Sequence, residues 1–394
     1  MIMDGTRPTG ISQAALRFAL EEREVTRRDV ANELEISFPT ATSAINELVA
    51  ANLLVELRTF QGPRGRASTV YGPSSEMGWI LGVDIGATHV SCIAESLTEL
   101  TIHSETLAHE GDSNPGRLAR QIIATAMSVT DAPLRGLGIA INQVVPTNPG
   151  PGAPTRFKRT EKTIAEALKD VVALEDLPIA VENNVNCSAM AEYTDGEMKG
   201  LPNSMYMQVG VGIGLGIFCN GTLIRGASGG SGELAQIPLS WDPGVPSPQD
   251  AIEKRYGSRG LLADAAKRLG DEAPDSVVKL FAMAAGGNRV ALETMRDGAS
   301  SLARIAAAAA AVLDPAVVVV GGGLTKNSQF ADFMIEEFRK CQPHIQMRVS
   351  TKGNIATAQG ATLIARDAAL TDLLGNHYRP RVPQPALWGI NNED

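Results

Sequence analysis

Along the first 75 residues, hydrophobic positions recur first at helical and then at strand spacing. A first helix is predicted from three apolar residues that share one face: Ala15, Leu16 and Leu20. A second helix is predicted to begin at Thr26, where Asp29 three residues later completes a capping-box pattern. Its inward face comprises Val30, Ala31 and Leu34.

A third helix is predicted after the short link Glu35-Ile36, with Ser37 as its cap and Phe38-Pro39 as its first turn. Its inward residues are Ala41, Ile45 and Leu48. This spacing is typical of a helix-turn-helix, whose last helix places its outward face in the DNA major groove. The side chains predicted to meet DNA there are short and form hydrogen bonds: Ser37, Thr40, Thr42, Ser43 and Asn46.

Two strands, 53–59 and 68–72, are predicted to pair as a hairpin, or wing, after the third helix. Its loop carries Arg64, Gly65 and Arg66, which suit the narrow minor groove of A·T-rich DNA. Because residues 38–50 contain no Lys or Arg, phosphate contacts are expected from Arg27, Arg28 and this loop. The alternative is that the three helices only pack or bind protein, and the exposed arginine pair favours DNA.

Beyond residue 75, strand-like runs alternate with helical, alanine-rich segments, which predicts α/β lobes with mixed sheets. The strand-like runs are 79–84, 137–141, 179–181, 205–209, 214–218 and 316–320. The alanine-rich stretch 305–312 is predicted to be a tightly packed helix. The last stretch, 376–394, is rich in proline and is predicted to be a tail, ordered or loose.

Composition narrows the class of protein. A chain of 394 residues exceeds what one hydrophobic core usually fills, so two or three domains are expected. The net charge is −9, of which about −1 falls in the first 75 residues, so DNA binding would depend on local arginines. The four cysteines lie far apart in sequence, which argues against disulfides. Neither a leader pattern nor an apolar run of membrane length is found, so we expect a cytoplasmic protein without a membrane partner.

Three glycine-rich turns follow strand-like runs. The first contains Asp84, Gly86 and Thr88; the second contains Gly210, Gly212 and Gly214; the third contains Gly322 and Gly323. Glycine lets a backbone approach an anion such as phosphate. Each of these patterns taken singly predicts no more than a tight turn.

Together with Glu182-Asn183-Asn184, the three turns resemble the ROK family (repressors, open reading frames and sugar kinases) over residues 76–370. The preceding winged helix resembles the repressor branch of that family. The resemblance implies an α/β fold of the actin-like ATPase, ribonuclease H-like type, in which two lobes close around a cleft. It also implies phosphate loops at 84–88 and 210–216 and an adenosine-side loop at 321–324.

The departures from the family pattern decide the expected activity. Asn184 stands where the family's kinases have an aspartate that acts as general base, so we expect no catalytic residue and no enzyme. Val211 replaces a threonine of the second loop, so the three turns are expected to be vestigial and no cofactor is expected. The stretch 237–257 has no Cys or His where the family binds zinc, so no metal is expected. His89 is predicted to be packed or solvated, although a role as base is the alternative.

Six polar residues remain, by resemblance, as candidates for binding a sugar or sugar phosphate: Asn142, Asn183, Asn184, Glu233, Gln236 and Glu253. Asn142-Gln143 replaces the family's Pro-Gly, so the cleft is altered. The alternative is that Asn183 and Glu233 bond only to loop backbone.

The sequence thus predicts three parts. Residues 1–75 form a winged helix-turn-helix, and 376–394 form the tail. Residues 76–375 form a two-lobed effector and oligomerisation domain, with lobe one at about 76–190 plus the C-terminal helix and lobe two at about 191–355.

The predicted function is that of a homodimeric or homotetrameric repressor, which binds a double-stranded DNA operator and is released by a sugar or sugar phosphate through lobe closure. One alternative is a regulator whose large domain only oligomerises. Another is an active sugar kinase, which Asn184 opposes.

Overall fold

The computed structural model describes residue 8 and residues 10–61, 67–109, 114–146, 155–169, 176–238 and 250–381, with the backbone alone for 155–159. By its internal contacts the chain divides into two compact units. The first unit comprises Met1–Ile141, Glu161–Glu182 and Ala361–Asp394. The second unit comprises Asn142–Thr160 and Asn183–Gly360. The predicted part boundaries at 75, 190 and 355 stay a prediction.

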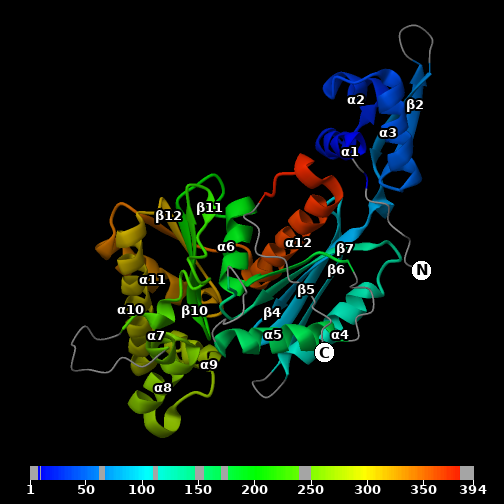
Figure 1. Cartoon of the computed structure of the whole chain (residues 1–394). Helices are drawn as coiled ribbons and strands as arrows, with labels where there is room; N and C mark the ends of the chain where they lie inside the picture. Colours follow the sequence, from blue (N-terminus) through cyan, green and yellow to red (C-terminus); the bar gives the residue numbers. More distant parts are fainter. Residues whose placement is uncertain are drawn as a thin grey trace. The chain divides into compact units, whose positions relative to one another are not determined.

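The first unit begins with the three predicted helices (Figure 1). They are α1 (Ile11–Glu22), α2 (Arg27–Glu33) and α3 (Phe38–Ala50). The capping box at Thr26 and Asp29 is confirmed, since each side chain bonds the backbone N–H of the other. Ser37 caps α3 as predicted, because its hydroxyl accepts a hydrogen bond from the Thr40 N–H.

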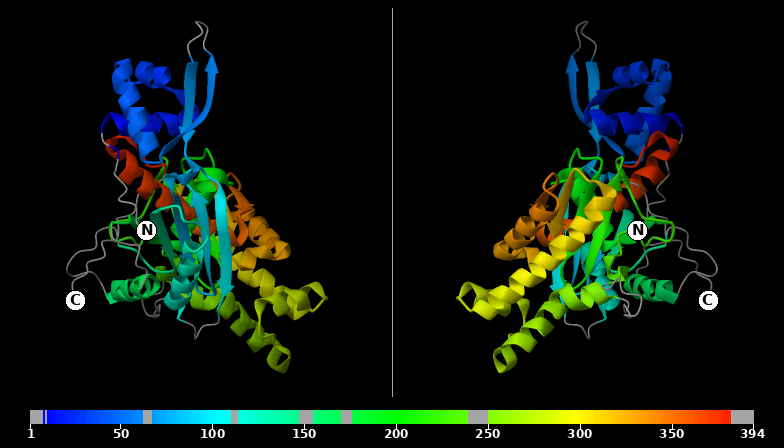
Figure 2. Two further views of the ribbon diagram at one scale, coloured as in Figure 1. Left: turned by 90° about the vertical axis from the view of Figure 1, so that its right-hand side faces the viewer. Right: turned by 90° about the vertical axis from the view of Figure 1, so that its left-hand side faces the viewer.

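A three-stranded sheet completes the N-terminal module. Its strands are β1 (Val25–Thr26), β2 (Leu54–Gln61) and β3 (Ala67–Pro73), in the order β1-β3-β2. The antiparallel pairing of β2 with β3 confirms the predicted hairpin. Both views in Figure 2 show these two strands running alongside the N-terminal helices.

The larger sheet of the first unit has the strand order β6-β5-β4-β7-β8. Its strands are β4 (Trp79–Ile85), β5 (His89–Ser96), β6 (Thr101–Ala108), β7 (Leu134–Ile141) and β8 (Ile179–Asn183). The central strand β4 is buried along its whole length, which explains why its residues are apolar except for Asp84. The helices nearby in sequence are α4 (Pro115–Met127) and α5 (Thr155–Leu168).

The second unit holds another five-stranded sheet, in the order β11-β10-β9-β12-β13. Its strands are β9 (Ser204–Val209), β10 (Ile213–Cys219), β11 (Thr222–Leu223), β12 (Val317–Gly321) and β13 (Gln346–Val349). Its helices are α6 (Asn184–Asp195), α7 (Ala251–Tyr256), α8 (Ser258–Leu269), α9 (Val277–Ala285), α10 (Arg289–Leu313) and α11 (Ser328–Cys341). The predicted alanine-rich helix is confirmed within α10, whose Ala303, Ala306 and Ala310 are fully buried in the core.

Helix α12 (Ala356–Leu374), late in the chain, packs against the helices at its beginning. Its last turns share one hydrophobic cluster with the N-terminal helices, including Leu16, Ile45, Leu373 and Leu374. The Gln13 amide also donates to the Leu373 carbonyl oxygen (3.4 Å), although the two residues lie 360 apart in sequence. The same helix crosses β7 so closely that a Cβ on Gly138 would lie 2.0 Å from the Ala361 carbonyl oxygen. The N-terminal module is therefore built onto the C-terminal helix.

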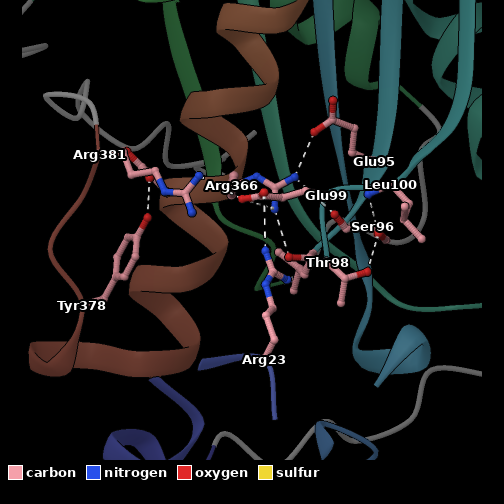
Figure 3. A network of polar contacts seen from close by, with 11 residues as sticks. Arg23, Glu95, Ser96, Thr98, Glu99, Leu100, Arg366, Tyr378 and Arg381 are labelled. Atoms are coloured by element: carbon pink, nitrogen blue, oxygen red, sulfur yellow. Dashed lines mark hydrogen bonds and ion pairs between the residues drawn. The ribbon is translucent and has the colours of Figure 1, made fainter. Parts of the chain in front are cut away.

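A polar network lies beside this shared core (Figure 3). The Glu99 carboxylate, in the turn between β5 and β6, pairs with Arg23 (3.5 Å), Arg381 (2.9 Å) and Arg366 (3.9 Å). The buried Arg366 also pairs with Glu95 (2.9 Å) and donates to the carbonyl oxygens of Leu97 and Ser96. Burial raises the pKa of Glu99, but the nearby arginines outweigh burial and lower this pKa overall.

The first residues of the predicted tail take part in this arrangement. The Tyr378 hydroxyl donates to Asp367 (2.5 Å), and Arg381 reaches Glu99. The tail is therefore ordered as far as residue 381, and its remaining residues, 382–394, lie outside the described residues.

Replacing Leu373 by alanine is expected to destabilise the N-terminal helices by about 2–5 kcal/mol, because it opens a cavity in a core that they share. Hydrogen exchange of the α1 and α3 amides measures this effect. Val278→Ala in α9 is the control, since Val278 is 74% exposed and its truncation is expected to stay within about 0.5 kcal/mol. Unchanged protection of α1 in Leu373→Ala would contradict the shared core.

Replacing Glu99 by glutamine is expected to remove part of the acid sensitivity of the first unit. Because the folded-state pKa of Glu99 is lowered, its carboxylate stabilises the folded state at pH values above its unfolded-state pKa, near 4.5. This stabilisation is lost as the pH falls through the folded-state pKa. Urea unfolding at a series of pH values from 7 down to 3 should show that the advantage of wild type over the variant shrinks as the pH falls. The difference should be about 1 kcal/mol or less, since Glu99 is partly solvated. A difference that does not change with pH would rule out this charge effect.

Candidate DNA interface and effector site

The third helix, α3, separates its apolar and polar residues as a DNA-reading helix requires. Its apolar face is buried in the cluster shared with α12: Ala41, Ala44, Ile45 and Leu48. On the polar face Ser43 and Asn46 are exposed, and Thr40 and Thr42 are half-buried. The predicted outward residues thus lie on one side of the helix.

The hydroxyl groups of α3 are bonded to the helix itself. Thr42 donates to the Phe38 carbonyl oxygen (2.9 Å), and Ser43 donates to the Pro39 carbonyl oxygen (3.2 Å). Their oxygens keep lone pairs for a base donor. Ser37 and Thr40 bond each other (2.7 Å) in the helix cap, so their first role is local.

The two arginines predicted to hold phosphates differ in setting. Arg28 is exposed, whereas Arg27 is half-buried. The Arg27 guanidinium lies over the Tyr71 ring, 4.9 Å from its centroid, and its Nη2 donates to the Asn46 Oδ1 (3.0 Å). Arg27 is therefore engaged with the protein, and its role as a phosphate contact stays a prediction.

Two features of this surface were missed from sequence. Tyr71 is almost fully buried and supports Arg27, a contact that no local pattern signals. Phe38 is 54% exposed at the start of α3, and its place in the first turn was the available signal. The predicted wing tip, Arg64, Gly65 and Arg66, lies outside the described residues, between the ends of β2 and β3.

Among the effector candidates, Asn183 has the best-defined role. Its Oδ1 accepts from the backbone N–H groups of Val185 (2.8 Å) and Asn186 (3.3 Å), which caps α6. Its Nδ2 donates to the Gln143 carbonyl oxygen (3.1 Å). The Gln143 side chain in turn accepts from the Thr160 hydroxyl (2.7 Å). Two of these bonds cap α6 and one reaches loop backbone, and a role of Asn183 in binding an effector stays a prediction.

The remaining effector candidates differ in burial and charge. Burial raises the pKa of Glu253, and the negative charges of Asp250 and Glu233 raise it further, so the Glu233 and Glu253 carboxylates are neighbours. Asn184 is buried at the start of α6. Asn142 and Gln236 are exposed.

The second and third glycine turns lie side by side in the second unit. Because β9 and β12 are parallel, their carboxyl ends bring Gly210 next to Gly323. Gly322 has φ +100, and a Cβ there would lie 2.5 Å from the Val209 carbonyl oxygen, so the turn needs glycine for packing. Gly212 accepts from the Gly210 N–H (3.1 Å), and Gly214 packs against Val185 of α6. Packing accounts for the glycines at 214 and 322, and the vestigial nature of the loops stays a prediction.

The first glycine turn is the hairpin between β4 and β5. The Gly86 N–H donates to the His89 carbonyl oxygen (3.0 Å), and the exposed Thr88 accepts or donates toward the His89 Nδ1 (3.2 Å). The His89 Nε2 lies 3.4 Å from the Asp84 Oδ2. Burial raises the pKa of Asp84, and the bond from His89 opposes this rise. His89 is thus packed against Asp84.

No three His, Cys, Asp or Glu side chains gather as a metal-ligand set within the part of the chain that is described. The family's zinc segment corresponds to 237–257, which has neither Cys nor His in its sequence, so its donor set does not fit tetrahedral zinc. Among the described residues, no helix is both long and apolar enough to span a bilayer.

Comparison with known proteins gives one family. The model of the ROK family matches residues 80–368. A xylose repressor of Bacillus spizizenii is 25% identical over 238 residues, which are 58% of this chain and 60% of that repressor. A glucokinase of Streptomyces coelicolor is 28% identical over 331 residues, which are 74% of this chain and 98% of the kinase.

One solved structure extends the similarity in fold. It is the crystal structure of a ROK family transcriptional regulator, a homolog of the E. coli MLC protein, and it covers 92% of this chain and 98% of its own. The TM-score is 0.65 at 20% sequence identity, so this likeness shows the fold. The expected two-lobed α/β architecture of sugar kinases is thereby confirmed.

Replacing Asn183 by alanine is expected to lower the free energy of unfolding by about 1–2 kcal/mol, because α6 loses its cap. Denaturant unfolding measures the loss. Asn142→Ala is the matched control, since Asn142 is exposed and its replacement is expected to change stability by less than about 0.5 kcal/mol. Equal stabilities of the two variants would contradict the capping role.

Proposed function

The chain belongs to the ROK family, and from this premise we propose that it is a DNA-binding transcriptional repressor controlled by a sugar or sugar phosphate. It acts as a homodimer or homotetramer, because paired helix-turn-helix modules match the two halves of a palindromic operator. Repressor function is supported by the xylose repressor relative, and xylose is therefore the first effector to try.

The observation that carries this proposal is the helix-turn-helix at residues 27–50. The polar face of α3 carries Thr42, Ser43 and Asn46, and the β2–β3 hairpin follows the helix as a wing would. Short hydrogen-bonding side chains on a solvated helix suit the edges of bases in the major groove.

Control by an effector is supported by the position of α6. Asn183 begins this helix, and the Ser188 hydroxyl farther along it bonds the Thr357 hydroxyl of α12 (2.9 Å). A Cβ on Gly360 of α12 would lie 1.9 Å from the Cys187 carbonyl oxygen, so the two helices touch through their backbones. Since the other end of α12 lies in the core of the DNA-binding module, α12 is the route by which an effector bound at α6 alters DNA affinity.

Sugar phosphorylation is not part of the proposal. The family's kinases use an aspartate where this chain has Asn184, and a neutral amide does not take a proton from a sugar hydroxyl. Loss of a general base forfeits about 10²–10⁴ in rate. The glucokinase relative keeps kinase activity as a candidate for testing.

A second candidate function is a repressor without a small effector, whose large domain only oligomerises. The bonds of Asn183 to α6 and to Gln143 favour it, because the amide is already occupied by backbone.

The test is selection of binding sites from genomic DNA with the full chain, repeated with xylose, glucose and their phosphates. We expect an inverted repeat that one compound releases by about 5- to 150-fold. An Arg64→Ala, Arg66→Ala double variant serves as the low-affinity control, with a weaker dependence on salt. Enrichment that no compound alters favours the second candidate. No enrichment contradicts DNA binding, and phosphate transfer from ATP to any sugar of the panel contradicts the loss of kinase chemistry.

A further inference from the structure

Asn46 and Arg27 form a pair on the DNA-facing side of α3, and the inference drawn from it rests on the proposed function. We propose that Arg27 is a positioning residue that turns the Asn46 amide so that its NH₂ group faces the DNA. Asn46 then reads a base with hydrogen-bond acceptors on its major-groove edge, and guanine above the others.

The orientation of the amide follows from hydrogen-bond chemistry. The Arg27 Nη2 lies 3.0 Å from the Asn46 side chain. A guanidinium carries five N–H donors and no acceptor, so the amide atom that faces it is the Oδ1. The Nδ2 group therefore points the other way. Asn46 is exposed on the same face as Ser43, which is the side that the proposed function turns toward DNA.

Arg27 is held in place from behind. Its guanidinium stacks on Tyr71 at a distance typical of cation–π contacts, and Tyr71 is only 1% exposed. The Arg27 Nε is buried and has no hydrogen-bond partner within the described residues, so this side chain gives up hydration to keep its position. Arg28, the next residue, is exposed and has no such support from the ring.

The orientation selects among bases. An asparagine with both amide groups available pairs with the N6 and N7 of adenine. When the Asn46 carbonyl is turned toward Arg27, its oxygen no longer lies beside the NH₂ group at the base edge, so the N6 donor of adenine loses its partner. Guanine offers two acceptors, N7 and O6, to the NH₂ group that remains. Cytosine presents its N4 amino group, which is also a donor, so the Asn46 NH₂ group disfavours cytosine. Loss of one such pair changes affinity by about 5- to 150-fold.

The experiment is selection from a random DNA library with the full chain as wild type, Arg27→Met and Arg28→Met. Both variants lose one positive charge, and methionine keeps an apolar stem over Tyr71. Wild type is expected to select guanine at one position of each half-site. Arg27→Met is expected to relax that position by about tenfold toward adenine, while Arg28→Met keeps every base preference and binds all sequences more weakly.

A second variant keeps the question answerable if Arg27→Met folds poorly. Asn46→Asp still pairs with Arg27 but presents an acceptor to the DNA, so cytosine should replace guanine at the same position. Circular dichroism and thermal unfolding verify that each variant is folded.

The outcomes separate the inference from the function on which it rests. If folded Arg27→Met keeps the guanine preference, or if Asn46→Asp selects the same base as wild type, the positioning role is wrong. If wild type selects no sequence at all, the proposed function fails first. A switch from guanine to adenine or cytosine in the two variants supports both.

Discussion

The hydrophobic contact between the N-terminal helices and the end of α12 is the constraint on which the rest of the structure depends. A module of about 65 residues buries only a modest share of its apolar surface and is marginal alone. Here Leu16 and Ile45 pack in one cluster with Leu373 and Leu374, so the C-terminal helix supplies part of their core. The helix α3 is therefore oriented by residues from the far end of the chain.

This contact also explains why charge is buried next to it. A guanidinium as inaccessible as that of Arg366 is costly unless each of its donors is paired. Glu95 and the carbonyl oxygens of Ser96 and Leu97 meet that need, and Glu99 extends the pairing to Arg23 at the end of α1. The β5–β6 turn thus fixes both α12 and the DNA-binding module, and polar groups specify the geometry that the apolar core stabilises.

The sequence predicted those features whose causes are local. The capping box at Thr26 and the cap at Ser37 depend on residues three apart, and the strands β4 and β12 depend on short, mostly apolar runs. The fold of the large domain followed from a family resemblance. The shared core did not follow, because no pattern within a window of a few turns relates Leu16 to Leu373.

The same limit applies to the candidate sites. Arg27 was expected to meet phosphate because it is basic and near the recognition helix, but its setting is decided by Tyr71, which approaches through the fold of the hairpin. Asn183 is the converse case. An asparagine between a strand and a helix is a familiar cap, and that local signal was available beside the family's suggestion of a sugar contact.

The double role of Asn183 bears on how an effector would act. A ligand that draws the Asn183 Nδ2 away from the Gln143 carbonyl oxygen must supply a hydrogen bond of similar strength. Tight binding by itself does not shift the equilibrium between two arrangements of the protein. What shifts DNA affinity is the difference in ligand affinity between two arrangements of α6, commonly about 1–3 kcal/mol. Because α6 meets α12 at Cys187 and Gly360 without a side chain between them, a small movement of one helix cannot be absorbed by a rotamer change of the other. Close backbone packing is thus what would carry the effect of a ligand into the core that holds the recognition helix.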